Sequence, residues 1–282
     1  MNSGQWHAEL LPRFRAGASA GHPEKSPLMT RFILSLFCIT SCIACDDSKA
    51  PAVPQKQAEV YTVSDWADWK KQDTGPQAKV EVKPEVAEKN APEGVKRPEL
   101  PAEAKKAGVL ILGTGQPFSA VKYEGKADIL PREGYEIAWD AMRLEGTDFF
   151  SALTFPVGRA EEGKKEKCVT LVTGGWGGWV LGVSSIGHQF ASENESTRSF
   201  EFKNGRWYRL TLQVTPEVIR CLIDGKEQFK VDVRDKALTM HPSEIQRCEP
   251  LGFASYESSG AIRNLQIRKL APGELKPDDT EN

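Results

Sequence analysis

The sequence lacks an excess of charge of either sign. It carries 37 basic and 39 acidic side chains, so its formal net charge is only -2 over 282 residues. A protein that binds nucleic acid needs a basic stripe to neutralise phosphates, and the composition supplies no such surplus. Nucleic acid is therefore not an expected partner.

The sequence also lacks an apolar run of the length that spans a bilayer, which is about 20 residues. The apolar run that stands out extends from Phe32 to Ile39, after Arg31 and before Thr40 and Ser41. A short apolar core between a basic residue and small residues is typical of an export signal. A buried core helix is the alternative, but the loop-like sequence beyond the run favours export.

Two cysteines after this run are candidate sites of lipidation. The segment from Ile39 to Cys42 resembles a bacterial lipobox, whereas Cys45 leaves a signal of more ordinary length. A diacylglycerol on the mature N-terminal cysteine would anchor the protein, because each buried CH2 group contributes about 0.8 kcal/mol. The sequence leaves the choice between Cys42 and Cys45 open.

Cysteine is scarce beyond this leader, where only Cys168, Cys221 and Cys248 remain. None of them belongs to a CxxC motif or lies near a histidine pair, so the spacing argues against a zinc site. Their odd number allows at most one disulfide within the chain. Buried thiols that act as small apolar groups are the alternative.

Residues 46–106 have the composition of a linker, rich in proline, lysine and glutamate. Such a segment buries too little apolar area to offset its ordering entropy, and its prolines keep it extended. Within it, Ser64 can cap a helix on which Trp66 and Trp69 share one face. We expect a short helix that docks both indoles onto the domain or a neighbour. A peptide that recruits a partner is the alternative.

Residues 107–271 change to short segments of alternating polarity separated by turn signals. One segment places four apolar residues on the same face: Tyr135, Ile137, Trp139 and Ala141. Asp224 and Gly225 indicate a hairpin, because both central positions of a type I′ turn need a positive φ. Many short strands with one apolar face predict an all-β fold, a two-sheet antiparallel jelly-roll sandwich.

Three stretches carry a family resemblance: Tyr135–Asp140, the pair Gly205–Tyr208 and Ile223–Gly225, and Ile262–Ile267. Through them the domain resembles the concanavalin A-like lectin/glucanase sandwich, and within it the bacterial 3-keto-disaccharide hydrolase-type domains. The resemblance implies a β-sandwich with a glycan ligand and, as one activity, hydrolysis of 3-keto-glycosides. This fold also carries lectins and adhesion modules, so it does not decide the activity.

The expected organisation has four parts. Residues 1–45 are a leader in which Met29 is the expected start, because the residues before it fit no signal; a long polar leader is the alternative. The disordered tether of residues 46–106 follows, then the sandwich, and residues 272–282 form a disordered tail. We expect the lipid anchor to hold the sandwich at the cell envelope, on the extracytoplasmic side of the membrane.

The segment Thr173–Gly182 frames Trp176 and Trp179 with glycines. It is not a phosphate loop, because it lacks both the Gly-Lys-Ser/Thr ending and a helix. Glycines allow a ligand to come close to the backbone, and the flat faces of indoles stack on sugar rings. On a regular strand the two indoles would point to opposite faces, so we expect at most one to face a ligand. Burial of both in the core is the alternative.

The polar loop that follows supplies the other candidate ligand-binding residues: His188, Glu193, Asn194 and Arg198. Together with Glu195 they can line a glycan site or bind Ca2+ through oxygen ligands. A solvated loop is the alternative. No other metal or cofactor is expected.

No catalytic residue is assigned. Glu136 and Asp140 share a face of one expected strand, but they are four residues apart. At about 3.3 Å per residue this separation is roughly 13 Å, which is too long for the acid pair of a glycosidase. A pair from different strands, Glu136 with Glu193 or Glu257, is the alternative, and no motif supports it.

Three functions follow from these features. The leading hypothesis is a lipoprotein that presents a carbohydrate-binding sandwich to a glycan or polysaccharide. One alternative is a glycoside hydrolase acting on 3-keto-glycosides or related sugars. The other is a structural adhesion module that binds another envelope protein.

Overall fold

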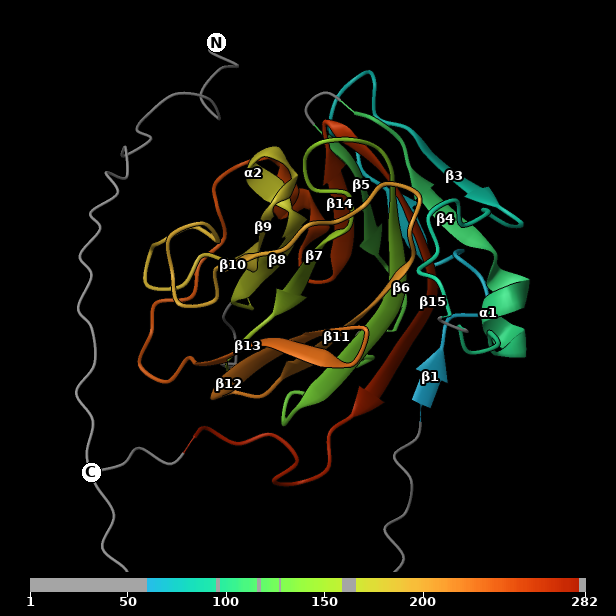
Figure 1. Ribbon diagram of the computed structural model, residues 1–282. Coiled ribbons are helices and arrows are strands. Elements are labelled where there is room, and N and C mark those ends of the chain that lie inside the picture. The colour runs from blue at the N-terminus through green and yellow to red at the C-terminus, as the bar shows by residue number, and fades with distance from the viewer. Residues whose placement is uncertain (1–59, 95–96, 116–117, 127, 159–165, 279–282) are drawn as a thin grey trace, which may run out of the picture. The chain divides into compact units, whose positions relative to one another are not determined.

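The computed structural model describes residues 60–278, apart from residues 95–96, 116–117, 127 and 159–165 (Figure 1). The predicted leader, with Met29, Cys42 and Cys45, lies outside the described residues. Within the described part, no helix combines the length and the apolar character that crossing a membrane requires.

The described residues form two antiparallel sheets packed face to face, which confirms the predicted all-β sandwich. The first sheet has the order β13-β12-β11-β6-β15-β4-β3, and β1 pairs with the C-terminal part of β15. In that order, ending with β1, its strands are Lys226–Asp232, Val218–Ile223, Tyr208–Val214, Tyr135–Gly146, Ser258–Lys269, Val109–Leu112, Val80–Lys83 and Val60–Thr62.

The second sheet has the order β10-β9-β8-β7-β14-β5-β2. In that order its strands are Arg198–Ser199, Val180–Ser184, Cys168–Gly174, Ala152–Pro156, Gly252–Tyr256, Phe118–Tyr123 and Trp69–Lys71. The helices in the described part are short: α1 (Ala102–Ala107), α2 (Gly175–Gly178) and the 3-10 helix η1 (Glu244–Cys248).

The main core lies between the two sheets and is built from alternate residues of their strands. The four residues predicted to share a face of β6 are all buried in it: Tyr135, Ile137, Trp139 and Ala141. Trp139 meets Phe253 of the opposite sheet edge-on, with ring centroids 5.6 Å apart. Full burial of such a side chain contributes about 1.5–3 kcal/mol, so this alternation holds the sandwich together.

The predicted hairpin at Asp224 and Gly225 is confirmed. These residues join β12 to β13 with φ values of 50° and 77°. The Asp224 carboxylate also accepts a hydrogen bond from the backbone N–H of Arg209 at 2.9 Å. The turn is therefore held by its backbone conformation and by the adjacent strand β11.

The predicted linker is wrong for the described residues between 60 and 106. Strand β1 pairs with β15, β2 with β5, and β3 with β4, so this region completes both sheets. Each of these strands has only three or four residues. Their apolar residues are too widely spaced for composition to reveal them, and their order comes from pairing with longer strands. Residues 46–59 of the predicted linker lie outside the described residues.

The segment around Trp66 and Trp69 is a turn leading into β2, not the predicted helix. The two indoles are 7% and 6% exposed, and their ring centroids lie 5.8 Å apart. Trp69 also packs against Tyr123 and Phe253, at 5.4 Å from each ring. Because both indoles are part of the core, this segment offers no aromatic surface with which to recruit a partner.

The predicted tail is also partly ordered against the domain. Leu275 is buried together with Val218 and Leu270. The Glu274 carboxylate pairs with Arg268 at 2.6 Å, and this ion pair lowers the pKa of Glu274. The domain therefore extends beyond residue 271, while residues 279–282 lie outside the described residues.

The three cysteines of the domain are buried thiols, and no disulfide joins them within the described residues. Burial in an apolar environment raises the pKa of Cys221 and raises that of Cys248 to about 12. Thiols held in the neutral form act as small apolar groups, which was the alternative to a disulfide in the sequence analysis.

Candidate functional site

The segment Thr173–Gly182 is a tight turn between two strands. Strand β8 ends at Gly174, Gly175–Gly178 form the single turn α2, and β9 begins at Val180 (Figure 1). Four residues here have a positive φ: Gly174 (83°), Trp176 (51°), Gly177 (80°) and Gly178 (96°). Glycine adopts this conformation at little steric cost, whereas for tryptophan it is strained.

The expectation that at most one tryptophan faces a ligand assumed a regular strand, whereas this segment is a turn. Trp176 and Trp179 are 38% and 54% exposed, so neither is a core residue. Single apolar residues at a surface are ordinary, but large aromatic side chains that gather there mark interaction sites.

Glycine is required at two positions because the turn packs closely on its surroundings. A Cβ on Gly178 would lie 2.7 Å from Nη1 of Arg143 and 3.1 Å from the carbonyl oxygen of Thr147. A Cβ on Gly175 would lie 2.6 Å from Cγ1 of Val172. The glycines therefore let the turn lie against the loop after β6, which fixes the positions of both indoles.

Asp148 links this loop to the turn. One carboxylate oxygen accepts a hydrogen bond from the backbone N–H of Phe149 at 2.8 Å, and the other accepts one from Gly177 at 3.4 Å. The Asp148 backbone N–H and carbonyl are in turn bound to the hydroxyl of Ser258, at 2.7 and 2.9 Å. The loop thus connects the tryptophan turn to the start of β15.

Three further aromatic rings lie beside this loop. Phe149 stacks on Phe118 and on Tyr256, with centroids 5.8 and 5.6 Å apart, and the rings of Phe118 and Tyr256 are 5.3 Å apart. The backbone N–H of Tyr256 donates to the carbonyl of Phe149 at 2.9 Å. We call the resulting group the aromatic end; it consists of the exposed Trp176 and Trp179, the half-buried Tyr256 and the buried Phe118 and Phe149.

Carboxylates accompany the aromatic rings. Glu257, exposed and with φ 46°, lies in the turn between β14 and β15 next to Tyr256. Burial, followed by the negative charge and hydrogen bond of Glu257 and the charge of Asp148, raises the pKa of Tyr256. The Tyr256 phenol therefore lies within electrostatic reach of both carboxylates.

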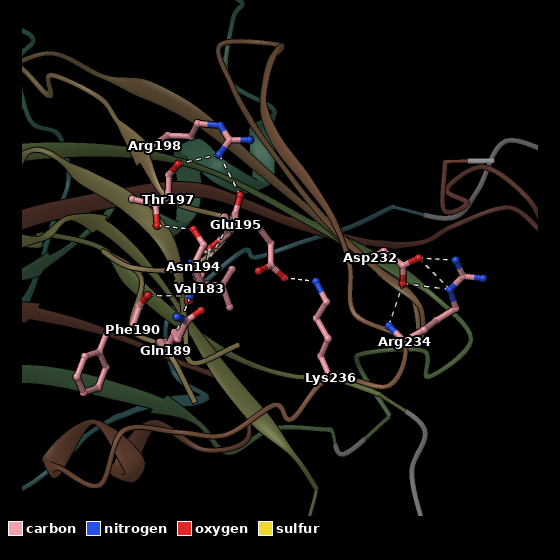
Figure 2. A network of polar contacts seen from close by, with 11 residues as sticks. Val183, Gln189, Phe190, Asn194, Glu195, Thr197, Arg198, Asp232, Arg234 and Lys236 are labelled. Atoms are coloured by element: carbon pink, nitrogen blue, oxygen red, sulfur yellow. Dashed lines mark hydrogen bonds and ion pairs between the residues drawn. The ribbon is translucent and has the colours of Figure 1, made fainter. Parts of the chain in front are cut away.

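Two of the predicted ligand-binding residues are used within the protein (Figure 2). Asn194 is 8% exposed, and its amide nitrogen donates to the carbonyls of Val183, Gln189 and Phe190 at 2.8, 3.1 and 2.8 Å. Its side-chain oxygen accepts hydrogen bonds from the backbone and hydroxyl of Ser196. Asn194 therefore shapes the loop, and a ligand role for it stays a prediction.

Arg198 likewise binds backbone carbonyls. Its Nε donates to Gln228 at 2.6 Å, and its Nη1 donates to Glu195 and Thr197 at 3.0 and 2.7 Å. The Glu195 carboxylate pairs with Lys236 (Figure 2). These contacts fasten the loop to β13 and to the segment after it.

His188 and Glu193 are exposed, but His188 lies far from the tryptophans along the chain's path. Trp179 precedes the five-residue strand β9, and His188 lies in the turn Ile186–Gln189 after it. Five residues at about 3.3 Å each separate the two by roughly 16 Å. The five-residue strand therefore separates His188 from the tryptophan turn, and a ligand role for His188 and Glu193 stays a prediction.

The described residues contain no group of three or more His, Cys, Asp or Glu side chains that could hold a metal ion. Glu136 and Asp140, which spacing excluded as a catalytic pair, form ion pairs with arginines of the first sheet. Glu136 lies 2.7 Å from Arg268, and Asp140 lies 3.1 Å from Arg209. The sequence interpretation missed Asp148 and Tyr256 as site residues, because their place at strand ends is their only signal. It named Glu257 only as a possible partner of Glu136 in a pair of carboxylates.

No protein family model matches the chain, and no curated protein is significantly similar in sequence. Solved structures with a similar arrangement include a carbohydrate esterase from Shiga toxin-encoding bacteriophage phi24B, which is 14% identical with a TM-score of 0.45. The match covers 76% of this chain and all of that one.

Two others come from bacilli. Domain 4 of the arabinanase AbnA from Geobacillus stearothermophilus, in complex with arabinotriose, is 16% identical with a TM-score of 0.38, covering 72% of this chain and 87% of that one. The carbohydrate-binding module CBM66 from Bacillus subtilis is 9% identical with a TM-score of 0.34. The match covers 57% of this chain and 86% of that one. Similarities this low do not show the function of this chain.

Proposed function

We propose that the chain is a carbohydrate-binding protein of the cell envelope and that the aromatic end is its glycan-binding surface. The observation that carries the proposal is the exposure of Trp176 and Trp179, 38% and 54%, on a turn fixed by close packing. The C–H face of a sugar ring is apolar and stacks on an indole face. Pre-positioned indoles also lose little conformational freedom on binding, so more of the contact energy contributes to affinity.

A binding experiment with matched variants tests this proposal. The full chain in detergent is run through affinity gels that contain soluble polysaccharides, beside Trp176→Ala and Trp179→Ala. We expect retention by at least one polysaccharide and a loss of retention in both variants. Tyr61→Ala is the control, because Tyr61 is 44% exposed on β1, which pairs with the opposite end of β15. Equal retention of all four proteins would contradict the proposal.

The anchor is proposed from the leader sequence alone. Lipidation at Cys42 or Cys45 would place the sandwich on the extracytoplasmic side of a membrane. Cells fed a radioactive fatty acid should label the full chain, and either Cys42→Ser or Cys45→Ser should remove the label. The variant that removes it identifies the lipidated residue; label retained in the double variant would exclude the anchor.

A second candidate function is the hydrolysis of 3-keto-glycosides or related sugars. It is favoured by two carboxylates at the aromatic end, those of Asp148 and Glu257, which both raise the pKa of Tyr256. A glycosidase needs one carboxyl group as an acid and another as a base or nucleophile. Release of sugar from a 3-keto-glucoside, abolished by Asp148→Asn or Glu257→Gln, would support this activity. Binding without turnover would leave the carbohydrate-binding role.

A further inference from the structure

We propose that two copies of this chain associate through strand β3 and join their first sheets into one continuous antiparallel sheet. β3 lies at one end of the first sheet, and no strand of the described part pairs with its other side (Figure 1). This surface is separate from the aromatic end, so the proposal goes beyond carbohydrate binding. Its basis is the open edge of β3 and the order of the charges along it.

The backbone of β3 presents hydrogen-bonding groups on its open side. The register between β3 and β4 places Lys79 opposite Gly113, whose N–H donates to the Lys79 carbonyl at 2.8 Å. Hydrogen bonds alternate along an antiparallel pair, so Glu81 and Lys83 bond to β4, while the N–H and C=O of Val82 face outward. An open edge with such groups can pair with another strand.

The side chains of β3 are exposed on both faces of the sheet. Val82 lies on the same face as its partner Leu110 and is 51% exposed. Glu81 and Lys83 lie on the opposite face, where Oε1 of Glu81 and Nζ of Lys83 form an exposed ion pair at 2.8 Å. Charged residues on an edge strand usually prevent pairing, because a second strand brings like charges together. Whether these two do so depends on the register.

A second copy fits this edge in one register. A two-fold axis perpendicular to the sheet makes the two β3 strands antiparallel. Two registers pair three residues of the strand and keep the alternation of hydrogen bonds. With the axis at Glu81, Glu81 faces Glu81 of the second copy, which is unfavourable.

With the axis at Val82, each Glu81 faces Lys83 of the other copy. The four charges then alternate in sign across the contact. The two Val82 residues face each other and exchange both of their backbone hydrogen bonds, because these groups point to the open side. Charge therefore selects one register, and the occupant that it favours is a second copy of the same chain.

The other edge of the first sheet differs from β3. It is formed by β13, where the carbonyl of Gln228 accepts a hydrogen bond from Nε of Arg198 at 2.6 Å. The polar loop that contains Arg198 therefore contacts this edge. Lys226 is exposed on β13, so it offers a matched position for a control.

Sedimentation velocity of the full chain in excess detergent, over a series of protein concentrations, tests the proposal. The contact is short, so we expect a weak, reversible dimer. Glu81→Lys places like positive charges opposite each other twice, and Lys83→Glu does the same with negative charges. Each variant should raise the dissociation constant of the dimer about tenfold or more. Lys226→Glu, the same kind of charge reversal on β13, should leave it unchanged.

Mixing the two variants tests the register. In a mixed dimer, positions 81 and 83 are both lysine in one copy and both glutamate in the other. Every facing pair is then of opposite sign, so the mixture should form dimers about as tightly as wild type. The double variant Glu81→Lys, Lys83→Glu also keeps opposite signs and should behave like wild type. Melting temperatures check that each variant folds.

Hydrogen exchange at single-residue resolution locates the contact independently. The amide of Val82, which faces the open side, should exchange more slowly as the protein concentration rises. Dimers weakened in both single variants and restored in the mixture support the proposal. A wild-type chain that stays monomeric at every concentration overturns it. A dimer that neither single variant weakens, or that mixing does not restore, also overturns it.

Discussion

Strand β9 has the glycine-rich turn α2 before it and a long polar loop after it. Both segments looked like ligand sites in the sequence, yet their side chains are used differently. Asn194 and Arg198 of the loop bind backbone carbonyls within the domain. Trp176 and Trp179 of the turn remain exposed. A polar side chain can satisfy backbone groups that would otherwise be buried without partners, whereas the carbon face of an indole ring accepts and donates no such hydrogen bonds and contributes by packing or stacking.

Removing the Asn194 side chain should have the largest effect on stability. The change Asn194→Ala leaves the buried carbonyl of Val183 and the partly buried carbonyl of Phe190 without their side-chain donor, so we expect the free energy of unfolding to fall by about 3 kcal/mol. Urea unfolding measures this change. Glu193→Ala, one residue earlier and exposed, should stay within about 0.5 kcal/mol of wild type. Equal effects of the two changes would mean that the loop is not held by Asn194.

Crowding and backbone conformation can be separated within the turn. Gly178→Ala adds a Cβ 2.7 Å from Arg143 and also strains a φ of 96°, so we expect a loss of about 2–3 kcal/mol. Gly177→Ala strains a φ of 80° but meets no atom within 4 Å, so its loss should be only about 1 kcal/mol. Thermal or urea unfolding of both variants measures the difference. Equal losses would show that close packing does not fix the turn.

The smallest expected change in the free energy of unfolding is an increase. Trp176→Gly relieves a non-glycine residue at φ 51°, and an exposed indole contributes little packing, so stability should rise by about 0.5–1 kcal/mol. The same variant should lose affinity for the glycan, because it lacks one of the two exposed indoles of the aromatic end. Stability that falls by more than about 1 kcal/mol would mean that Trp176 supports the fold rather than a ligand site.

The fold was predictable where strands are long and one face is buried. The apolar alternation of Tyr135 to Ala141 identified β6, and the dipeptide Asp224-Gly225 identified a hairpin, because both signals are local. Strands β1 to β3 were missed because three or four residues carry no readable period. Their stability comes from pairing with β15, β5 and β4, which lie far away in the sequence.

The candidate site was predictable only in part. Glycines on both sides of two tryptophans predict a ligand-binding segment, and this stays a prediction; the rule for a regular strand does not apply, because the segment is a turn. The left-handed residues of this turn pack against Arg143 and Thr147, which no local pattern reveals. The sequence did not single out Asp148, whose contact with the segment before β15 depends on the hydroxyl of Ser258, 110 residues away.

The balanced charge and the alternation that buries two layers of extended chain can be read from the sequence, and the leader stays a prediction of the sequence. That the described residues between 60 and 106 pair into the sandwich and that both tryptophans are exposed became clear only in the folded structure. The difference lies in the distance along the chain over which each interaction acts. Periodicity and turn propensity act over a few neighbouring residues, whereas strand pairing and the exposure of a side chain depend on which distant segments lie against it.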